Sequence, residues 1–167
     1  MPVDWWGWRG NRMLRITEFL QPSWIKLELN SHKKKDVLLE LLTLFQNEGL
    51  IDEPQKDQIL KDLLEREKVS STGIGSGVAI PHKIVPGLKT TVIALGRKKK
   101  GIPFDSIDGL PVTLAFLILG KEGSEAFHLR LLSKLARLLQ QESFREELSR
   151  SESPDQIISI LHRWEEE

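Results

Sequence analysis

The chain has 167 residues, with 24 lysines and arginines balanced by 24 aspartates and glutamates, so its formal net charge is zero. No net field therefore attracts it to nucleic acid or to an anionic membrane surface, and we expect neither as a partner. The lack of cysteine excludes disulfides, thiol catalysis and any zinc or iron–sulfur centre held by thiolates. The longest apolar stretch, residues 112–119, is too short to span a bilayer, so direct membrane insertion is not expected.

Residues 1–12 differ in character from the rest of the chain. They contain Trp5, Trp6 and Trp8 but show no helical or alternating hydrophobic period. We therefore expect a disordered N-terminal appendage, followed by one domain over residues 13–167. The alternative is that these tryptophans anchor a partner protein.

The first part of the domain predicts one strand and two helices. Alternating apolar residues favour a strand over 24–29, and Asn30 or Ser31 can cap a helix that stops at Gly49. Asp52 offers a cap for a second helix. The apolar faces of the two helices are formed by Val37, Leu38, Leu41, Leu42, Leu44, Phe45, Ile59, Leu60, Leu63 and Leu64.

The centre of the chain predicts strands joined by loops. Glycines and short polar residues over 71–77 favour tight turns, and a strand is expected over 78–80. Further strands are predicted at 90–95 and 112–119, the latter apolar on both faces and therefore central in a covered sheet.

The residues between these two strands are expected to form a basic turn at 97–100 and a loop at 101–111. After them, an apolar stripe predicts a helix over 126–139, and two shorter helices are expected on either side of residues 151–154. This order of elements predicts an α/β fold in which helices cover the faces of a sheet.

The four histidines differ in their surroundings. His32 and His162 lie among charged residues near element ends and are expected to be solvated. His82 directly follows the strand that ends in Pro81, and His128 lies in the first turns of the long helix.

A neutral imidazole can attack phosphorus without a metal if cations and amide groups neutralise the oxygens. His82 can be such a nucleophile, Arg66 can supply a cation, and residues 73–77 can supply backbone amides. The structural alternative is that the glycines only make a tight connection and that His82 is a hydrogen-bonded residue at the end of a strand.

Other kinds of site fit less well. The glycines do not form a dinucleotide fingerprint, because Val78 occupies the place of its last glycine and a strand follows. No P-loop is present, and no two histidines have metal-ligand spacing, so neither a metal nor a cofactor is expected. Ser71 and Thr72 lack a neighbouring general base that would make either a nucleophile.

The basic runs and two of the aspartates are expected to have structural and not functional roles. The basic runs at 33–35 and 97–100 lack interleaved aromatic residues and are expected to be solvated surface. Asp105 and Asp108 are expected to shape a turn with their side chains.

The segments from Arg66–Glu67 and Ser71 through His82 closely resemble the active-site region of a known family. This family comprises the fructose- and mannitol-type IIA domains of the bacterial phosphoenolpyruvate-dependent phosphotransferase system, of which the nitrogen-regulatory IIA proteins are the nearest branch. The resemblance continues through residues 102–112 and His128–Leu129 and covers roughly residues 14–163.

The resemblance implies a mixed parallel and antiparallel sheet with helices on both faces. It also implies that His82 accepts a phosphoryl group through Nε2 from the phosphohistidine of a small carrier protein, while a neighbour holds Nδ1. Arg66 corresponds to the arginine that steadies the phosphoryl group, and His128 to the second histidine of the site. The phosphoryl group then passes to a sugar-specific IIB domain, or it serves as a regulatory mark read by a kinase, transporter or transcription factor, in either case in the cytoplasm.

Further groups complete the expected site. Ser71, Thr72, Gly73 and Gly75 are candidates for binding the phosphate. Lys83 replaces the small residue that commonly follows the active histidine in the family, and it can either add a cation at the phosphate or point to solvent.

Partner proteins need an apolar surface on which to dock. The candidates for this surface are Ile74, Ile84, Val85 and Phe127. The alternative is that these side chains belong to the core.

Overall fold

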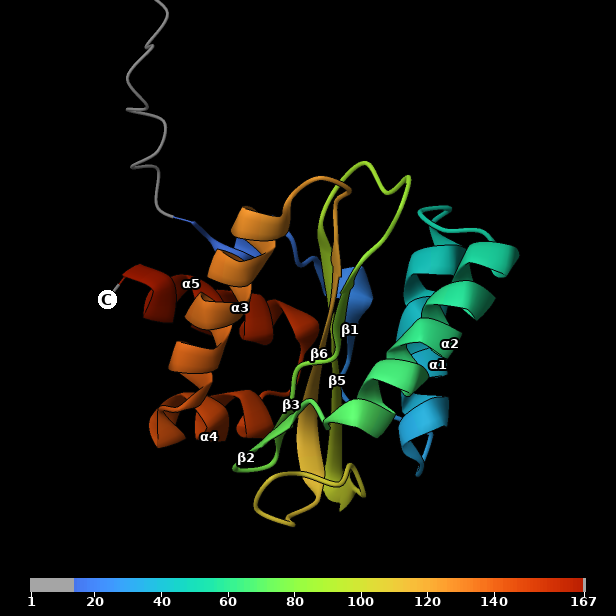
Figure 1. Ribbon diagram of the computed structural model, residues 1–167. Helices are drawn as coiled ribbons and strands as arrows, with labels where there is room; N and C mark the ends of the chain where they lie inside the picture. Colours follow the sequence, from blue (N-terminus) through green and yellow to red (C-terminus); the bar gives the residue numbers. More distant parts are fainter. Residues whose placement is uncertain (1–13, 167) are drawn as a thin grey trace, which may run out of the picture.

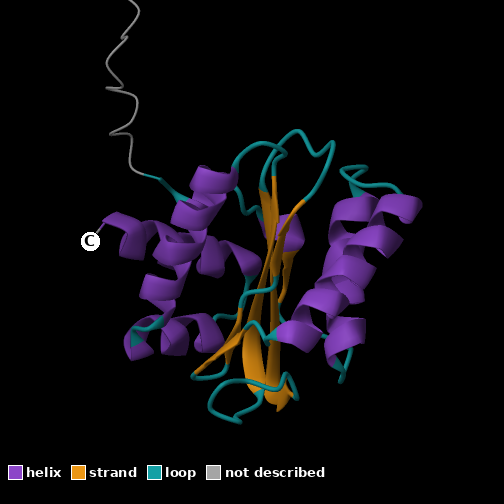
Figure 2. Ribbon diagram, in the orientation of Figure 1, coloured by secondary structure: helices purple, strands orange, loops and turns teal. Residues whose placement is uncertain are grey.

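The computed structural model describes residues 14–166. Over these residues a mixed sheet forms the middle layer, as Figure 1 shows. Helices α1 and α2 cover one face of this sheet, and α3, α4 and α5 cover the other; Figure 2 separates the layers by colour. The expected α/β architecture is confirmed.

The sheet has six strands within the described residues, in the order β1-β5-β6-β3-β2, and β4 also pairs with β6. Strand β5 runs antiparallel to β6, β2 is antiparallel to β3, and the other pairs are parallel. The strands span Ile25–Lys26 (β1), Gly73–Gly75 (β2), Val78–Ala79 (β3), His82–Ile84 (β4), Val92–Ile102 (β5) and Val112–Gly120 (β6).

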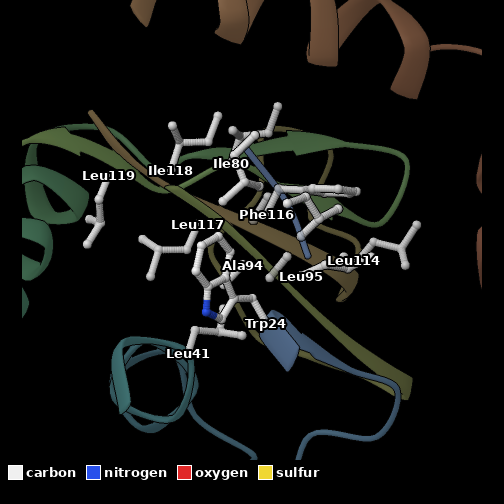
Figure 3. Close-up of a cluster of buried hydrophobic side chains, with 14 of the residues drawn as sticks. Trp24, Leu41, Ile80, Ala94, Leu95, Leu114, Phe116, Leu117, Ile118 and Leu119 are labelled. Carbon is white, nitrogen blue, oxygen red and sulfur yellow. The ribbon is translucent and has the colours of Figure 1, made fainter. Parts of the chain in front are cut away.

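Strand β6 is central because both of its faces are apolar and covered by helices. Successive side chains of a strand point to opposite faces. Figure 3 shows this alternation, with Ile118 on the side of Ile80, and Leu117 on the side of Trp24 and Leu41. The side chains of β6 therefore contribute to the core on both sides of the sheet.

The helices span Lys34–Asn47 (α1), Glu53–Val69 (α2), Glu125–Leu139 (α3), Glu142–Arg150 (α4) and Pro154–Glu166 (α5). The predicted cap of α2 is confirmed: the Asp52 carboxylate accepts the Gln55 amide N–H at 2.8 Å, and the Gln55 side chain accepts the Asp52 N–H in return. Pro154 is the first residue of α5, where its missing N–H is not needed. Gly49, at φ +74°, follows the end of α1 as expected.

The predicted first strand and cap are partly wrong. Only Ile25–Lys26 forms a strand, because residues 22–24 form a 3-10 helix. The N-cap of α1 is Lys33, without a side-chain cap, and not Asn30 or Ser31. Instead, the carboxylate of Glu40 accepts the backbone N–H groups of Asn30 and Ser31 and the Ser31 hydroxyl.

The predicted basic turn at 97–100 is also wrong, since these residues continue strand β5. The expectation of solvated surface fails for Arg97 and Lys98, which are buried, and holds for Lys99 and Lys100. The Arg97 guanidinium donates to the carbonyl oxygens of Leu27, Leu148, Ser149 and Ser151, and the Lys98 ammonium donates to that of Leu29. These charged side chains can be buried because main-chain carbonyl oxygens accept hydrogen bonds from them.

The predicted appendage of residues 1–12 lies outside the described residues. The chain from Leu14 onward enters the fold through a 3-10 helix, Ile16–Glu18. This helix contacts α5, and the buried Glu165 carboxylate accepts the Ile16 N–H and the Thr17 hydroxyl.

Candidate functional site

His82 is the first residue of β4 and pairs with Ile118 of the central strand. Its ring is half-buried, and Nδ1 lies 2.8 Å from the carbonyl oxygen of Ile80. A carbonyl oxygen can only accept a hydrogen bond, so Nδ1 carries the proton in this contact. The lone pair is consequently on Nε2, which is the tautomer that a nucleophile attacking through Nε2 requires.

His128 lies beside His82, with ring centroids 5.6 Å apart and the rings inclined at 49°. It lies on α3, is 6% exposed, and neither ring nitrogen has a hydrogen-bond partner among residues 14–166. Gly120 makes room for this ring, because a Cβ atom at Gly120 would lie 2.5 Å from Nδ1 of His128. The end of β6 thus has to be glycine for the second histidine to reach His82.

Burial lowers the pKa of His128, and the neighbouring His82 lowers it further. His128 is therefore neutral at neutral pH, with one N–H to donate and one nitrogen to accept a proton. A dianion on His82 would favour the charged form and raise this pKa. The ring is placed to respond to the charge on its neighbour.

Arg66 is exposed in the last turn of α2. Its guanidinium donates to the carbonyl oxygen of Ser70 at 2.7 Å, and no hydrogen bond joins it to His82 in the described part of the chain. One turn earlier, Asp62 contacts Lys83, the residue next to His82, so α2 passes close to β4. Arg66 is thus on the helix that flanks β4, with its side chain turned to its own helix end.

The predicted phosphate-binding residues 71–75 are largely engaged with the protein. The Ser71 hydroxyl donates to the carbonyl oxygen of Phe104 at 2.5 Å and accepts the Gly73 N–H at 3.0 Å. Thr72 is buried, and both its N–H and its hydroxyl donate to the Glu67 carboxylate. Gly73 and Gly75 belong to β2 and not to an open loop. These groups shape the segment that leads to His82, and in this structure they do not present a free amide nest.

Lys83 points away from His82. Adjacent residues on β4 face opposite sides of the sheet, and the Lys83 ammonium lies 3.0 Å from the Asp62 carboxylate of α2. From the sequence, the Lys83 side chain is expected either at the phosphate or in solvent. Both expectations are wrong, because Lys83 forms an ion pair with Asp62. The pair joins β4 to α2, with Lys83 and Asp62 both partly exposed.

Replacing Lys83 by methionine is expected to raise the pKa of Asp62, because the Lys83 hydrogen bond is the main cause of its lowering from 3.8. A lowered carboxyl pKa stabilises the fold above the pKa of the unfolded chain, and this contribution disappears as the pH falls through the folded-state value. The expected loss at neutral pH is below about 1 kcal/mol, since the pair is partly exposed. An NMR titration of the Asp62 carboxyl, with urea unfolding at neutral and acidic pH, measures both effects. Lys89→Met, at an exposed position, is the control; an unchanged Asp62 titration in Lys83→Met would contradict the prediction.

The predicted docking residues lie in different environments. Val85 is 3% exposed and belongs to the core, while Ile84 and Phe127 are half-buried. Phe127 packs edge-on against Phe19, with ring centroids 5.3 Å apart. Ile74 is 45% exposed.

Ile74 belongs to a patch of exposed apolar side chains, together with Ile107 and Leu110 of the loop between β5 and β6, and of these three the sequence singled out only Ile74. The Ile107 N–H donates to the Gly73 carbonyl oxygen, so the loop lies against β2. This patch lies near the level of Leu114 on β6, and His82 near that of Ile118, so about 13 Å separates them along the strand. A standard protein interface is wide enough to include both.

Of the two loop aspartates, Asp108 shapes a turn with its side chain as the sequence predicts, whereas the Asp105 carboxylate instead forms an ion pair with Lys34 of α1. The Asp108 carboxylate accepts the N–H groups of Ser76 and Leu110, which lowers its pKa and ties the β2–β3 turn to the loop. Asp105 is exposed, at φ +52°, and lies 3.7 Å from the Lys34 ammonium. His32 and His162 are exposed, also as predicted.

Residues 14–166 contain no group of three or more acidic, histidine or cysteine side chains arranged to hold a metal ion. No helix among them has the length and apolar character needed to cross a bilayer.

The sequence reasoning missed two residues at this site. Gly120 was not singled out, although a glycine that ends an apolar strand directly before the helix bearing His128 is a signal for close packing. Glu67 stands next to Arg66 in the sequence, and no local pattern indicates that its carboxylate is buried.

Comparison with known proteins gives a consistent result. Residues 18–164 match the family model described as phosphoenolpyruvate-dependent sugar phosphotransferase system, EIIA 2. Among curated relatives, the fructose-specific EIIABC component of Bacillus subtilis is 39% identical over 150 residues, 90% of this chain but 23% of that protein. The nitrogen regulatory protein of Bradyrhizobium diazoefficiens is 36% identical over 146 residues, 87% of this chain and 94% of that protein.

A solved structure with the same fold is that of nitrogen regulatory protein IIA-Ntr from Neisseria meningitidis. It is 37% identical, has a TM-score of 0.80, and the match covers 87% of this chain and 98% of that one. The mixed sheet between two helical layers is therefore shared with a IIA protein at substantial sequence identity. With the match to the family model over residues 18–164, these findings show that the chain belongs to the EIIA 2 family of the phosphoenolpyruvate-dependent sugar phosphotransferase system.

Proposed function

We propose that the chain is a phosphoryl carrier and that His82 receives the phosphoryl group from the phosphohistidine of the small carrier protein of the phosphotransferase system. The observation that carries this proposal is the hydrogen bond from Nδ1 of His82 to the Ile80 carbonyl oxygen, which leaves the Nε2 lone pair for attack. The bond from phosphorus to the carrier imidazole breaks, and its electron pair stays with that imidazole. A bond from phosphorus to Nε2 of His82 forms, while Nδ1 keeps its proton.

The transition state carries negative charge on three equatorial oxygens, which cationic and hydrogen-bonding groups can stabilise without a metal. The exposed Arg66 side chain can exchange the Ser70 carbonyl for a phosphoryl oxygen, a stronger acceptor because it is charged. His128 can donate its N–H to the same group at short range. Among the predicted phosphate ligands, Thr72 and Lys83 are not part of this proposal, because Glu67 and Asp62 hold them.

The test is incubation of the purified chain with phosphoenolpyruvate, the general phosphotransferase enzyme and the carrier protein. Intact-mass measurement should show the addition of one phosphoryl group that is lost in acid, as expected of a phosphorus–nitrogen bond. Omitting the carrier protein is the control and should give no addition. An acid-stable phosphate, or none in the complete mixture, would contradict the proposal.

Replacing Arg66 by alanine is expected to slow phosphoryl transfer about a hundredfold, the usual effect of removing one donor aimed at developing charge. The fold should stay intact, because the guanidinium is exposed and its only described bond is to the Ser70 carbonyl oxygen. Rapid-quench measurement of single-turnover transfer from the phosphorylated carrier gives the rate. Arg137→Ala, an exposed arginine on α3, is the control; equal rates for the two variants would remove Arg66 from the mechanism.

Replacing His128 by alanine is expected to leave acceptance by His82 partly intact and to impair onward transfer. The Nε2 nucleophile and its Nδ1 anchor do not depend on His128, whereas the proton that His128 takes up beside the dianion helps to stabilise the departing group. Phosphorylation by the carrier and transfer from the phosphorylated chain to a purified IIB domain are measured separately. Equal slowing of the two steps would show that His128 does not distinguish them. Unfolding in urea is the control for lost packing.

The downstream partner is either a sugar-specific IIB domain or a regulated protein. Similarity to the nitrogen regulatory proteins favours a regulatory mark, because phosphorylation adds nearly two negative charges to a surface that a partner can read. The apolar patch of Ile74, Ile107 and Leu110 is the proposed docking surface. We also place the protein in the cytoplasm, where the phosphorelay operates. Phosphoryl transfer from His82 to purified IIB domains would identify a transport role, and binding that depends on phosphorylation without transfer would identify regulation.

A further inference from the structure

A buried carboxylate lies at the end of α2, immediately after Arg66. The Glu67 side chain is 3% exposed, and its oxygens accept hydrogen bonds from the Lys34 ammonium at 2.9 Å and the Thr72 N–H at 3.1 Å. They also accept the Thr72 hydroxyl. A buried carboxylate requires such a set of donors, since a charge without partners is expensive to bury. Glu67 therefore fixes both the side chain and the N–H of Thr72.

Thr72 is joined to the reactive histidine by two further hydrogen bonds. The Thr72 carbonyl oxygen accepts the Ile80 N–H at 3.0 Å. The Ile80 carbonyl oxygen in turn accepts the Nδ1 proton of His82 at 2.8 Å. An unbroken series of contacts thus runs from the Glu67 carboxylate through Thr72 and Ile80 to the His82 ring.

We propose that Glu67 is a positioning residue for His82: by holding Thr72, it fixes Ile80 and so keeps the proton of His82 on Nδ1. The effect on phosphoryl transfer rests on the proposed function above, whereas the effect on the tautomer does not. Glu67 does not touch the phosphoryl group. It acts on a carbonyl oxygen whose position decides which ring nitrogen carries the hydrogen.

The geometry of the ring makes this control effective. An imidazole has two nitrogens of similar proton affinity, and the hydrogen bond made by one decides the state of the other. If the Ile80 carbonyl shifts, Nδ1 loses its acceptor, and the proton is free to occupy Nε2, where it blocks the lone pair. The net free energy of one hydrogen bond corresponds to a change of about two- to tenfold in the ratio of the two tautomers.

Lys34 connects the same carboxylate to a second segment. Its ammonium lies 3.7 Å from the Asp105 carboxylate and 4.7 Å from the centre of the Phe104 ring. Ser71, the residue before Thr72, donates its hydroxyl to the Phe104 carbonyl. The segment before β2 is thus held from α1, α2 and the loop after β5, with Glu67 at the point where these contacts meet.

The proposal can be tested with Glu67→Gln, which keeps the shape of the side chain but leaves one acceptor oxygen where there were two. An NH₂ group then faces either the Lys34 ammonium or Thr72, both of which are donors. Thr72→Val is the second variant, because it removes the hydroxyl and keeps the N–H. The controls are Thr72→Ser, which restores the hydroxyl, and Glu65→Gln, an exposed carboxylate two residues away on α2.

The primary readout is the ¹⁵N chemical shifts of the His82 ring, which report the tautomer whether or not the protein accepts phosphate. We expect Glu67→Gln and Thr72→Val to increase the Nε2–H form by about two- to tenfold, and the two controls to leave it unchanged. Single-turnover phosphorylation should slow by a similar factor, with a shifted pH profile.

An unchanged tautomer in folded Glu67→Gln and Thr72→Val would overturn the proposal. If Glu67→Gln does not fold, the comparison of Thr72→Val with Thr72→Ser decides. A protein that takes up no phosphate but shows the expected tautomer shifts would refute the proposed function while supporting the role of Glu67. Slower transfer without a tautomer shift would also overturn the proposal, because Glu67 would then affect transfer by another route.

Discussion

A His82→Ala protein is expected to take up no phosphoryl group from the carrier protein. Nε2 of His82 is the atom that forms the bond to phosphorus, and the neighbouring His128 cannot replace it, because its ring is 6% exposed and closed off beside Gly120. Intact-mass analysis after incubation with the complete phosphoenolpyruvate-dependent system measures the effect. The loss of phosphorylation should be complete, whereas the loss of a supporting group such as Arg66 leaves a slow reaction.

The control for this experiment is His162→Ala, an exposed histidine near the end of α5 that should be phosphorylated like the original chain. The His82→Ala protein should remain folded, since the half-buried ring makes one described hydrogen bond, worth about 1 kcal/mol. Phosphate on a folded His82→Ala protein would assign the reaction to another residue. Circular dichroism of the same samples verifies the fold.

Replacing Arg97 by methionine is expected to lower the free energy of unfolding by about 3 kcal/mol. The guanidinium donates to four main-chain carbonyl oxygens, three of them at and just beyond the end of α4. The carbonyl oxygens of Ser149 and Ser151 have no partner within the helix, so methionine leaves them without donors, whereas that of Leu148 keeps the Ser151 N–H. Urea unfolding followed by circular dichroism measures the loss.

The matched control is Lys100→Met, an exposed position on the same strand, for which a change within about 0.5 kcal/mol is expected. If the two variants lose similar free energies of unfolding, the loss comes from replacing a cation on this strand and not from the contacts with the carbonyl oxygens. The Arg97→Met protein should also retain the hydrogen bond between His82 and Ile80, because Arg97 lies on the far side of β6 from β4.

Those parts of the fold with a strong local signal could be predicted from the sequence. The all-apolar run at 112–119 identified the central strand, and Asp52 identified the start of α2. In both cases one physical requirement dominates: burial on two faces for the strand, and an acceptor for free N–H groups for the helix.

Other features depend on contacts between distant segments, which no local pattern records. Arg97 is 51 to 54 residues away from the α4 carbonyls that it satisfies, so its run of positive charge looked like surface. Asn30 and Ser31 are good caps by type, but the Glu40 carboxylate binds them from the second turn of α1. In each case a tertiary partner outweighs the local propensity.

The candidate site shows the same division. His82, Arg66 and His128 could be singled out because residue type, glycine-rich context and resemblance to a family all pointed to them. The role of Thr72 could not be predicted, because a threonine in a polar segment gives no sign of whether its hydroxyl faces a ligand or a buried carboxylate such as Glu67. The opposite directions of Lys83 and His82 follow from strand geometry, but only once β4 is known to begin at His82.

The alternating side chains of strand β4 limit where residues can be inserted into or deleted from the chain. His82 faces the layer of α3, while Lys83 faces that of α2, and only one peptide bond separates them. Deleting or inserting a single residue between Pro81 and Ile84 would exchange the two faces and put an aliphatic or cationic chain where the imidazole belongs. Natural variation in length should therefore collect in the exposed turn at Pro86–Gly87, which lies after the strand, and be absent from the strand itself.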